Sequence, residues 1–404
     1  MIAVPDFHAR ADVRKHIQET MQFYHPHCID PDGGFYHFYK DDGRIYDTRT
    51  RHLVSSTRFV FTYAMAARQL DGVGSLEQVR HGLRFLREAH RNPATGGYAW
   101  QIDRHEGQTT VLDGSNHCYG LAFVLLAYSH ALMAGAGEAR EFIGETFELM
   151  ERRFWQADDG LYADEASADW ATLDGYRGQN ANMHSVEALL AAYEATQELR
   201  YLHRAELIAH NITVRQANLA DGLIWEHYKT DWSVDWDYNR DDASNIFRPW
   251  GFQPGHLTEW SKLLLIMERY ADKLQRPSDW ILPRAEALFN AGLDTAWDKE
   301  HGGIFYGFAP DGAICDGDKY HWVQAESLAT AAVLGKRTGE AKYWDWYDRM
   351  WEYCWAHFVD HKNGAWFRIL RADNSACTED KSPAGKVDYH NMGACYEILN
   401  TLSR

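Results

Sequence analysis

Three histidines and an arginine each lie close to the start of a segment with a helical pattern of apolar residues. They are His184, His256, His390 and Arg58, and the pattern predicts that both His184 and His256 lie in a first helical turn. A histidine titrates near neutral pH and exchanges a proton without a metal, so a cluster of three suits acid and base chemistry on a neutral substrate. One histidine at a helix start is more often a cap or a packing residue, so the prediction depends on all four lying together.

Several neighbours could support these histidines. Glu259 lies three residues after His256 and shares its helix face, so its carboxylate can orient the imidazole or bind a substrate hydroxyl. Pro254 suits the first helical position. Asn180 is both a candidate N-cap and a candidate ligand, and Glu187 is expected to be a capping partner or a surface group.

A repeat predicts the elements that position these residues. Turn motifs recur at Gly34, Gly97, Gly160, Gly222, Gly303 and Gly364, at steps of 63, 63, 62, 81 and 61 residues. Each motif indicates a turn into a short strand, as in residues 35–39 or 366–370, and each interval has room for two helices. A pair of antiparallel helices cannot bury its apolar face alone, so six pairs should close into a ring. The sequence therefore predicts an all-α (α/α)6 barrel with short β-hairpins at the mouth, as one domain over residues 1–404.

The candidate residues keep a similar phase within this repeat. Counted from the glycine of each unit, the polar residues near the helix starts lie 24, 20, 24, 34, 23 and 26 residues further on, at Arg58, His117, His184, His256, Glu326 and His390. In a ring, these helix starts converge on one mouth, where we predict the active site. The long fourth interval contains residues 230–242, which lack a helical pattern and are expected to form a loop over that mouth.

Composition and motifs exclude several classes of function. The chain has 41 Lys and Arg against 58 Asp and Glu, a net charge of −17, without a basic run, so nucleic acids and anionic membranes are poor partners. The six cysteines form no C-x-x-C pair, and the chain shows neither a signal peptide nor a long apolar stretch, which predicts a cytoplasmic protein with reduced thiols. Metalloprotease, nucleotide-binding and serine-hydrolase motifs do not occur, and we expect no metal and no cofactor.

The chain resembles the N-acylglucosamine 2-epimerase superfamily, a metal-independent group of sugar epimerases and aldose–ketose isomerases on (α/α)6 barrels. The resemblance spans nearly the whole chain. The residues that carry it are Thr57-Arg58, the run from Tyr176 to His184, the run from Phe247 to His256 with Glu259-Trp260, Trp322 with Glu326, and Tyr389-His390.

Within the superfamily the chain is most similar to the mannose isomerase branch, which implies interconversion of D-mannose and D-fructose through an enediol. The resemblance implies that His256 and His390 transfer protons, and that Arg58, His184 and Glu259 bind and polarise the sugar. Asn180 and Trp322 complete the implied site, and the phase of the repeat adds His117 and Glu326 as substrate-binding residues. One departure is Ile246, where the related sulfoquinovose isomerases carry an arginine, so a sulfonated sugar is disfavoured.

Other functions remain open at this stage. A 2-epimerase would use the same intermediate but return the proton to C2 from the opposite face, on a free aldose, an N-acyl hexosamine or a disaccharide. A glycoside hydrolase needs two carboxylates about 5 to 9.5 Å apart, for which Asp113, Glu259 and Glu326 are candidates. A sugar-binding protein without turnover is a third possibility. The expected partner is a monosaccharide, mannose or fructose with lyxose as a further candidate, and the expected assembly is a monomer or homodimer.

Overall fold

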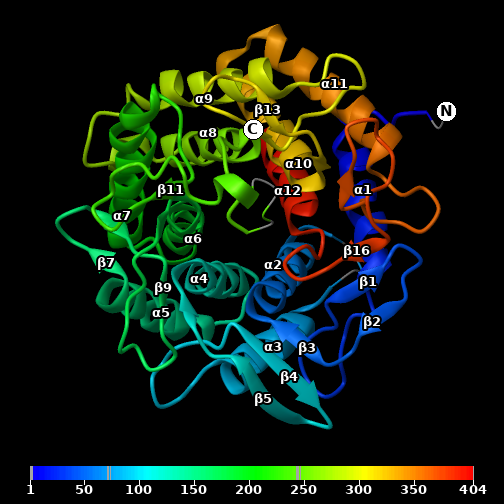
Figure 1. The fold of residues 1–404 in the computed structure, drawn as a ribbon. Helices are drawn as coiled ribbons and strands as arrows, with labels where there is room; N and C mark the ends of the chain where they lie inside the picture. Colours follow the sequence, from blue (N-terminus) through cyan, green and yellow to red (C-terminus); the bar gives the residue numbers. More distant parts are fainter. Residues whose placement is uncertain (1–2, 71, 73, 243–244, 246, 404) are drawn as a thin grey trace.

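The computed structural model describes residues 3–70, 72, 74–242, 245 and 247–403, and places their helices in two concentric rings (Figure 1). Each inner helix packs against the next around the ring, and the last packs against the first. The inner helices are α2 (Leu53–Gln69), α4 (Cys118–Met133), α6 (Gln179–Thr196), α8 (Pro254–Glu268), α10 (His321–Thr338) and α12 (Tyr389–Ser403).

Each inner helix also packs against one helix of the outer ring. Five of these partners follow their inner helix directly, whereas α1, the first helix of the chain, covers α12, the last. The outer helices are α1 (Arg10–Tyr24), α3 (Leu76–Phe85), α5 (Ala139–Arg153), α7 (Leu199–His210), α9 (Ile281–Ala296) and α11 (Ala341–His357). Shorter π or 3-10 turns cover Leu86–His90, Asn211–Gln216, Ala217–Ala220, Arg240–Asp242 and Ala271–Lys273.

The distribution of apolar residues explains the two rings. Nearly every side chain of α4 is buried, as expected for a helix surrounded by protein, whereas α3 and α7 bury one face and expose the other. The polar residues buried on the inner helices gather near their first turns, as Ser55 to Arg58 do on α2. The predicted (α/α)6 barrel is confirmed, and the N-terminal ends of the inner helices surround its mouth.

Short antiparallel strands connect neighbouring units around that mouth. The ring of pairings closes where β16 joins β1, so the chain's last strand pairs with its first. The sheets are β16 (Asp380–Ser382) with β1 (Phe38–Lys40) and β2 (Ile45–Asp47); β3 (Thr50–His52) with β4 (Gln101–His105) and β5 (Gln108–Asp113); β6 (Asn116–His117) with β9 (Glu165–Ala166); β7 (Trp155–Gln156) with β8 (Leu161–Tyr162); β10 (Arg177–Gly178) with β11 (His227–Tyr228); β12 (Gly307–Phe308) with β13 (Ile314–Asp316); and β14 (Lys319–Tyr320) with β15 (Ile369–Leu370).

The strands after the glycine turns are shorter than predicted. Phe35 makes only an isolated bridge to Ile29, and regular pairing begins at Phe38. A buried Arg or Lys side chain instead fixes the segment that leads into an inner helix. In four units this side chain bonds to a residue of the preceding turn, 21 positions earlier in the chain. These pairs are Arg51 with Asp30, Arg177 with Gln156, Lys319 with Asp298 and Lys381 with Asp360.

The fourth interval contains the expected loop. Residues 230–242 have no regular helix beyond the 3-10 turn Arg240–Asp242, and buried Trp232 anchors the loop through a hydrogen bond from its Nε1 to Gln156. The lid function stays a prediction. Ile246 lies outside the described residues.

All six cysteines are free thiols, as the sequence predicted. Within the part of the chain that the structure describes, no helix combines the length and the apolar character needed to cross a bilayer.

A group of buried histidines beside α2 predicts acid sensitivity. His90 donates from Nδ1 to the carbonyl of Ala99 and accepts from Ser56, and burial lowers its pKa from 6.5 to about 4. Burial also lowers the pKa of His52 to about 3 and that of His37 well below 6.5. Below pH 6.5 the unfolded chain therefore binds protons that the folded chain does not, so the free energy of unfolding falls with falling pH.

The expected contribution of His90 is about 1.4 kcal/mol for each pH unit between about 6.5 and 4. Denaturant titrations at pH 4.5, 5.5 and 6.5 should show this slope, and His90→Asn should remove that share of it while keeping a donor for Ala99. His105→Asn, at the exposed end of β4, is the matched control and should leave the slope unchanged. An unchanged slope in His90→Asn would contradict the assignment.

Candidate active site

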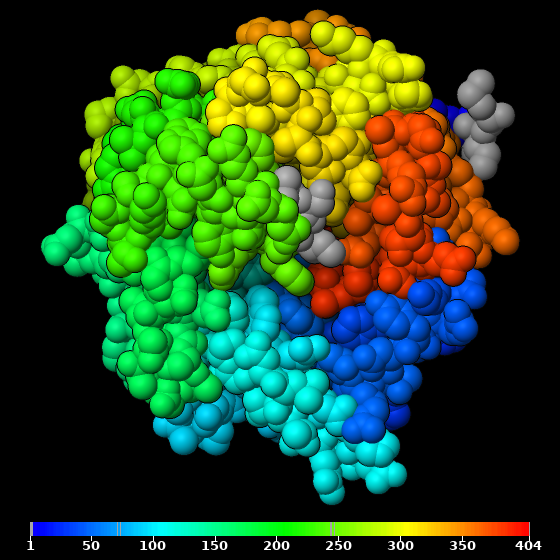
Figure 2. Space-filling model, viewed as in Figure 1, coloured from blue at the N-terminus to red at the C-terminus, as the bar shows by residue number. Residues whose placement is uncertain are grey.

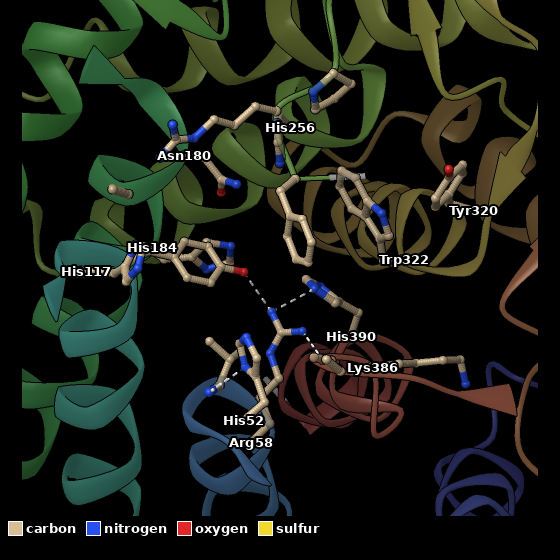
Figure 3. Close-up of a pocket in the computed structure, with 18 of the residues that line it drawn as sticks. His52, Arg58, His117, Asn180, His184, His256, Tyr320, Trp322, Lys386 and His390 are labelled. Carbon is tan, nitrogen blue, oxygen red and sulfur yellow. Dashed lines mark hydrogen bonds between the residues drawn. The ribbon is translucent and has the colours of Figure 1, made fainter. Parts of the chain in front are cut away.

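A cavity of about 440 Å³ opens at the mouth of the barrel, where the first turns of the inner helices converge. On the surface it appears as a small hollow between green, cyan, blue and red segments, which belong to different units (Figure 2). Eight of the nine predicted site residues line it, and the ninth, Glu326, lies behind His390. Those eight are Glu259 and the seven residues labelled in Figure 3 as Arg58, His117, Asn180, His184, His256, Trp322 and His390.

The helix starts place these residues somewhat differently from the prediction. Pro254 begins α8, so His256 lies in its first turn as expected. By contrast α6 begins at Gln179 with Gly178 as its N-cap, which puts His184 in the second turn and Asn180 inside the helix. Asn180 is therefore not the cap. Its buried Oδ1 has no hydrogen-bond partner among the described residues, which leaves this oxygen for a ligand.

Each of the three histidines has a carboxylate at Nδ1. The distances from Nδ1 are 2.8 Å for His184 to Glu187, 2.9 Å for His256 to Glu226, and 2.7 Å for His390 to Glu326. A carboxylate at Nδ1 fixes the ring's orientation and leaves Nε2 for the cavity. Glu187 is thus neither a cap nor a surface group, and it also accepts a hydrogen bond from the Tyr389 hydroxyl.

The partner of His256 differs from the predicted one. Both oxygens of Glu226 lie within 3.0 Å of Nδ1, and Glu226 also accepts from Nε2 of Gln179 at 2.9 Å. The Oε1 of Gln179 accepts from Trp260, and Nε2 of Gln179 also lies 3.0 Å from Nδ1 of His256. Because the two Glu226 oxygens are acceptors at Nδ1, we assign the Nδ1 proton to a hydrogen bond with Glu226. The prediction that Glu259 orients His256 is wrong, because a side chain from the preceding segment occupies that place.

Glu259 is fully buried, and neither of its oxygens has a hydrogen-bond partner among the described residues. Burial and the nearby charge of Glu326 raise its pKa well above 4.5, which favours the protonated form of this carboxyl group in the cavity wall. The ammonium of Lys262 bonds to Glu326, and the surrounding carboxylates raise the lysine's pKa despite its burial. Glu259 can therefore both donate to and accept from a sugar hydroxyl.

His390 is held as a neutral base. Nη2 of Arg58 lies 3.3 Å from its Nε2, and because a guanidinium can only donate, Nε2 must carry the lone pair and Nδ1 the proton given to Glu326 (Figure 3). Burial and the positive charge of Arg58 hold the pKa of His390 well below 6.5. An unprotonated nitrogen therefore faces the cavity beside a cation.

Arg58 is fixed from several sides. It donates to the carbonyl of Gly385 and to the Tyr119 hydroxyl, and its guanidinium lies 4.4 Å from the ring centroid of Phe123 and 4.5 Å from that of Tyr389. These contacts include no carboxylate. Its charge is consequently available to an anion that develops in the cavity.

Aromatic rings form much of the remaining wall. Trp322 contacts both proton-transfer candidates, with ring centroids 4.9 Å from His256 and 5.7 Å from His390. His117 packs against Trp100 with ring centroids 4.0 Å apart, and its Nε2 lies 2.9 Å from the Ser115 hydroxyl. Flat apolar faces edged by polar groups suit a sugar ring.

A family model for N-acylglucosamine 2-epimerases matches residues 33–394. The chain belongs to this family. It is 51% identical to the D-mannose isomerase of Marinomonas mediterranea over the full length of both chains.

Solved structures agree with this fold. A crystal structure of D-mannose isomerase, 51% identical, superposes with a TM-score of 0.95 and covers 99% of this chain and 100% of that one. The cellobiose 2-epimerase of Spirochaeta thermophila DSM 6192, 23% identical, reaches 0.85 over 98% of this chain and 96% of its own, a likeness that shows the fold alone.

Two groups of side chains at this site lie close enough together to be candidate metal ligands. In His184–Glu187–Glu259 and in Glu259–Glu326–His390, the potential ligand atoms lie within 4.8 Å of one another. The ammonium of Lys262 already lies against Glu326, and Nδ1 of each histidine is directed at a carboxylate. The metal-free site stays a prediction.

Two residues of the site, Glu226 and Lys262, were not predicted from the sequence. Glu226 is a charged residue between large side chains in the buried segment 224–228, directly after a glycine turn, and that position is an available signal for a buried functional carboxylate. Lys262 follows Glu259 by three residues on the same helix face and is buried with it.

Proposed function

We propose that the chain is a metal-independent aldose–ketose isomerase that interconverts D-mannose and D-fructose through an enediol, acting as one domain over residues 1–404. The full-length identity to a D-mannose isomerase supports this substrate. The observation that carries the chemistry is the neutral Nε2 of His390 beside the guanidinium of Arg58 in the cavity at the mouth of the barrel. A base next to a fixed cation suits removal of a proton alpha to a carbonyl.

The cyclic sugar must open first. His256, held by Glu226 with its Nε2 toward the cavity, shuttles a proton between the ring oxygen and the anomeric hydroxyl. Trp322 packs against His256 and keeps the ring in place. His256 can afterwards move protons between O1 and O2.

Proton transfer on carbon follows in the open form. Nε2 of His390 takes the proton from C2 of the aldose, the electrons move toward O1, and the same nitrogen returns the proton to C1. Arg58 and His184 stabilise the negative charge that develops on oxygen, a contribution of about 3 to 4 kcal/mol for a well-placed donor. Glu326 accepts a hydrogen bond from Nδ1 of His390 throughout the reaction. We therefore assign Glu326 to positioning His390 and not to binding the substrate.

The remaining residues bind hydroxyl groups. Glu259 and Asn180 both present a buried oxygen without a partner among the described residues, and each lines the cavity. His117 and Trp322 contribute the aromatic wall. A cavity of about 440 Å³ lies within the usual range for small-molecule sites, about 300 to 1,000 Å³.

The three carboxylates considered for hydrolysis do not face one another across the cavity. Of the three candidate carboxylates, Glu259 lines the cavity, whereas Glu326 lies behind His390 and Asp113 bonds to Ser115 outside the lining. A 2-epimerase remains the alternative, because His256 and His390 could exchange protons with C2 from two sides of the sugar.

The test is a proton NMR time course of D-mannose in deuterated water with EDTA, beside parallel samples of N-acetylglucosamine and cellobiose. We expect fructose from mannose, unaffected by EDTA, with deuterium at C1 to the extent that the His390 proton exchanges with solvent. Glucose from mannose, or a change at C2 in one of the other sugars, would replace the proposal by the epimerase. Loss of activity with EDTA and recovery with a metal would contradict the metal-free mechanism.

A further inference from the structure

In some units, a side-chain amide near the start of the inner helix bonds to the backbone of a residue that follows the glycine turn. In the third unit, Asn182 accepts from the Tyr162 amide at 2.9 Å and donates to the Tyr162 carbonyl at 3.0 Å. Gln324 makes the same two bonds to Ile304, at 2.9 and 2.8 Å. One neutral amide thus satisfies both backbone groups.

The last unit makes this connection with two charged side chains. Asp388 accepts from the Trp366 amide at 3.3 Å, and Nζ of Lys386 donates to the Trp366 carbonyl at 2.8 Å. The lysine also lies 2.6 Å from Oδ2 of Asp388, and that same oxygen accepts from the hydroxyl of Tyr24 on α1. We call Tyr24, Lys386 and Asp388 the Tyr24 cluster; all three are buried, with exposures of 0%, 4% and 0%.

The backbone within this cluster is strained. Val387 and Asp388 have φ values of +33° and +48°, in the left-handed region that side chains seldom adopt, and a β-branched valine is especially unfavourable there. Such a conformation persists only where surrounding contacts impose it. The hydroxyl of Ser382 accepts from the Val387 amide, and the Tyr24 cluster holds the next residue.

The strained turn, residues 385–388, positions the catalytic groups. The carbonyl of Gly385 accepts from Arg58, and the Gly385 amide donates to Ser55 at 2.7 Å. Directly after the turn, Tyr389 donates to Glu187, the partner of His184, and His390 follows in the first turn of α12. One turn thus sets the position of Arg58 and His390 together.

We propose that the Tyr24 cluster consists of positioning residues, which hold the strained turn so that Arg58 and Nε2 of His390 keep the geometry required for proton transfer. The inference rests on the function proposed for Arg58 and His390. It assigns a role in the reaction to Tyr24, which lies on the outer ring and is not among the residues that line the cavity.

Stability alone gives a poor account of the charged cluster. A buried ion pair loses much of its attraction to desolvation, and neutral amides make the equivalent bonds in two other units. What the charged version adds is a second acceptor oxygen on Asp388, which reaches α1 through Tyr24. The charged cluster therefore adds a hydrogen bond that ties residues 385–388 to α1.

The test compares Tyr24→Phe with Tyr39→Phe. Tyr39 is equally buried, its ring centroid lies 5.4 Å from that of Tyr24, and its hydroxyl has no partner among the described residues, so both variants delete one buried hydroxyl from one aromatic group. In Tyr24→Phe we expect kcat for mannose to fall about ten-fold with KM within two-fold, because a small displacement of reacting groups is costly. Tyr39→Phe should keep both constants.

A second readout does not require turnover. The charged and titratable groups that face His390 are Arg58, His184, Glu187, Glu259, Lys262, His321 and Glu326. If the turn loosens in Tyr24→Phe, Arg58 moves away, its positive charge depresses the pKa of His390 less, and the pKa rises. Histidine-selective NMR titration measures this shift in the whole protein.

The outcomes separate the two proposals. A wild-type protein that leaves mannose unchanged contradicts the proposed function, and the NMR titration then decides the positioning role by itself. Active wild type with unchanged kcat and unchanged His390 titration in Tyr24→Phe overturns the inference, as does an equal loss in Tyr39→Phe. Asp388→Asn introduces the amide that the other units use, and asparagine tolerates positive φ, so this variant should fold. It should nevertheless lose more activity than Tyr24→Phe. An Asp388→Asn variant with the turnover of the wild type would also overturn the inference.

Discussion

His390→Asn is expected to lower kcat for mannose isomerisation by about 10³-fold, within the range for loss of a general acid–base group. The side-chain amide nitrogen of the introduced asparagine can still donate to Glu326, which now receives Nδ1 of His390 at 2.7 Å, so the packing behind the site should survive. What disappears is the lone pair on Nε2 that faces Arg58. Sugar binding should remain measurable by tryptophan fluorescence, because Trp322 lies against the cavity.

Exchange of the C2 proton with solvent tests the role of His390 more directly than overall turnover does. In deuterated water the variant should also stop exchanging the C2 proton of mannose, since His390 is the group assigned to that proton. His130→Asn is the matched control, because His130 is a half-buried histidine near the far end of α4, away from the mouth. Retention of more than about a tenth of the wild-type turnover would contradict the role and transfer it to His256.

The arrangement of the site could be predicted because the repeat constrains it. Residues that keep phase at the starts of six inner helices must converge once the ring closes. The shared location of Arg58, His184 and His390 could therefore be predicted without knowing which side chains they contact, and all three line the cavity. The glycine turns fixed the spacing, and the mostly apolar inner helices fixed which ring each helix belongs to.

The repeat could not predict which carboxylate contacts each histidine from another part of the ring. Which carboxylate reaches Nδ1 of a histidine depends on ring rotation and on side chains from other segments: Glu226 is 30 residues before His256, and Glu326 is 64 before His390. Local helix spacing suggested the wrong partner for His256, and it was not applied to Glu187, which was expected to be a cap or a surface group but bonds to His184 three residues earlier. The left-handed conformation of Val387 also has no local signal, because tertiary contacts impose it against the residue's preference.

Glu226→Gln is expected to lower kcat by about 10²-fold to 10³-fold, by analogy with loss of the carboxylate that orients a catalytic histidine. An amide at this position can donate to Nδ1 of His256, which would place the proton on Nε2 and reverse the tautomer that the shuttle requires. Mannose binding should change little, because Glu226 does not line the cavity. Steady-state kinetics and the nitrogen chemical shifts of His256 measure the two effects.

Glu259→Gln distinguishes the observed partner from the predicted one. The Glu259 oxygens have no hydrogen-bond partner among the described residues, so this variant should leave the His256 tautomer unchanged and act mainly on KM through a sugar hydroxyl. Glu151→Gln, which removes a carboxylate that bonds to Tyr162 and Arg204 away from the cavity, controls for loss of charge. If Glu259→Gln altered the tautomer and Glu226→Gln did not, Glu259 would orient His256 after all. The opposite result would show that the imidazole of His256 is held from the preceding segment, so that α8 supplies the proton shuttle while the carboxyl group of Glu259 is left free for the substrate.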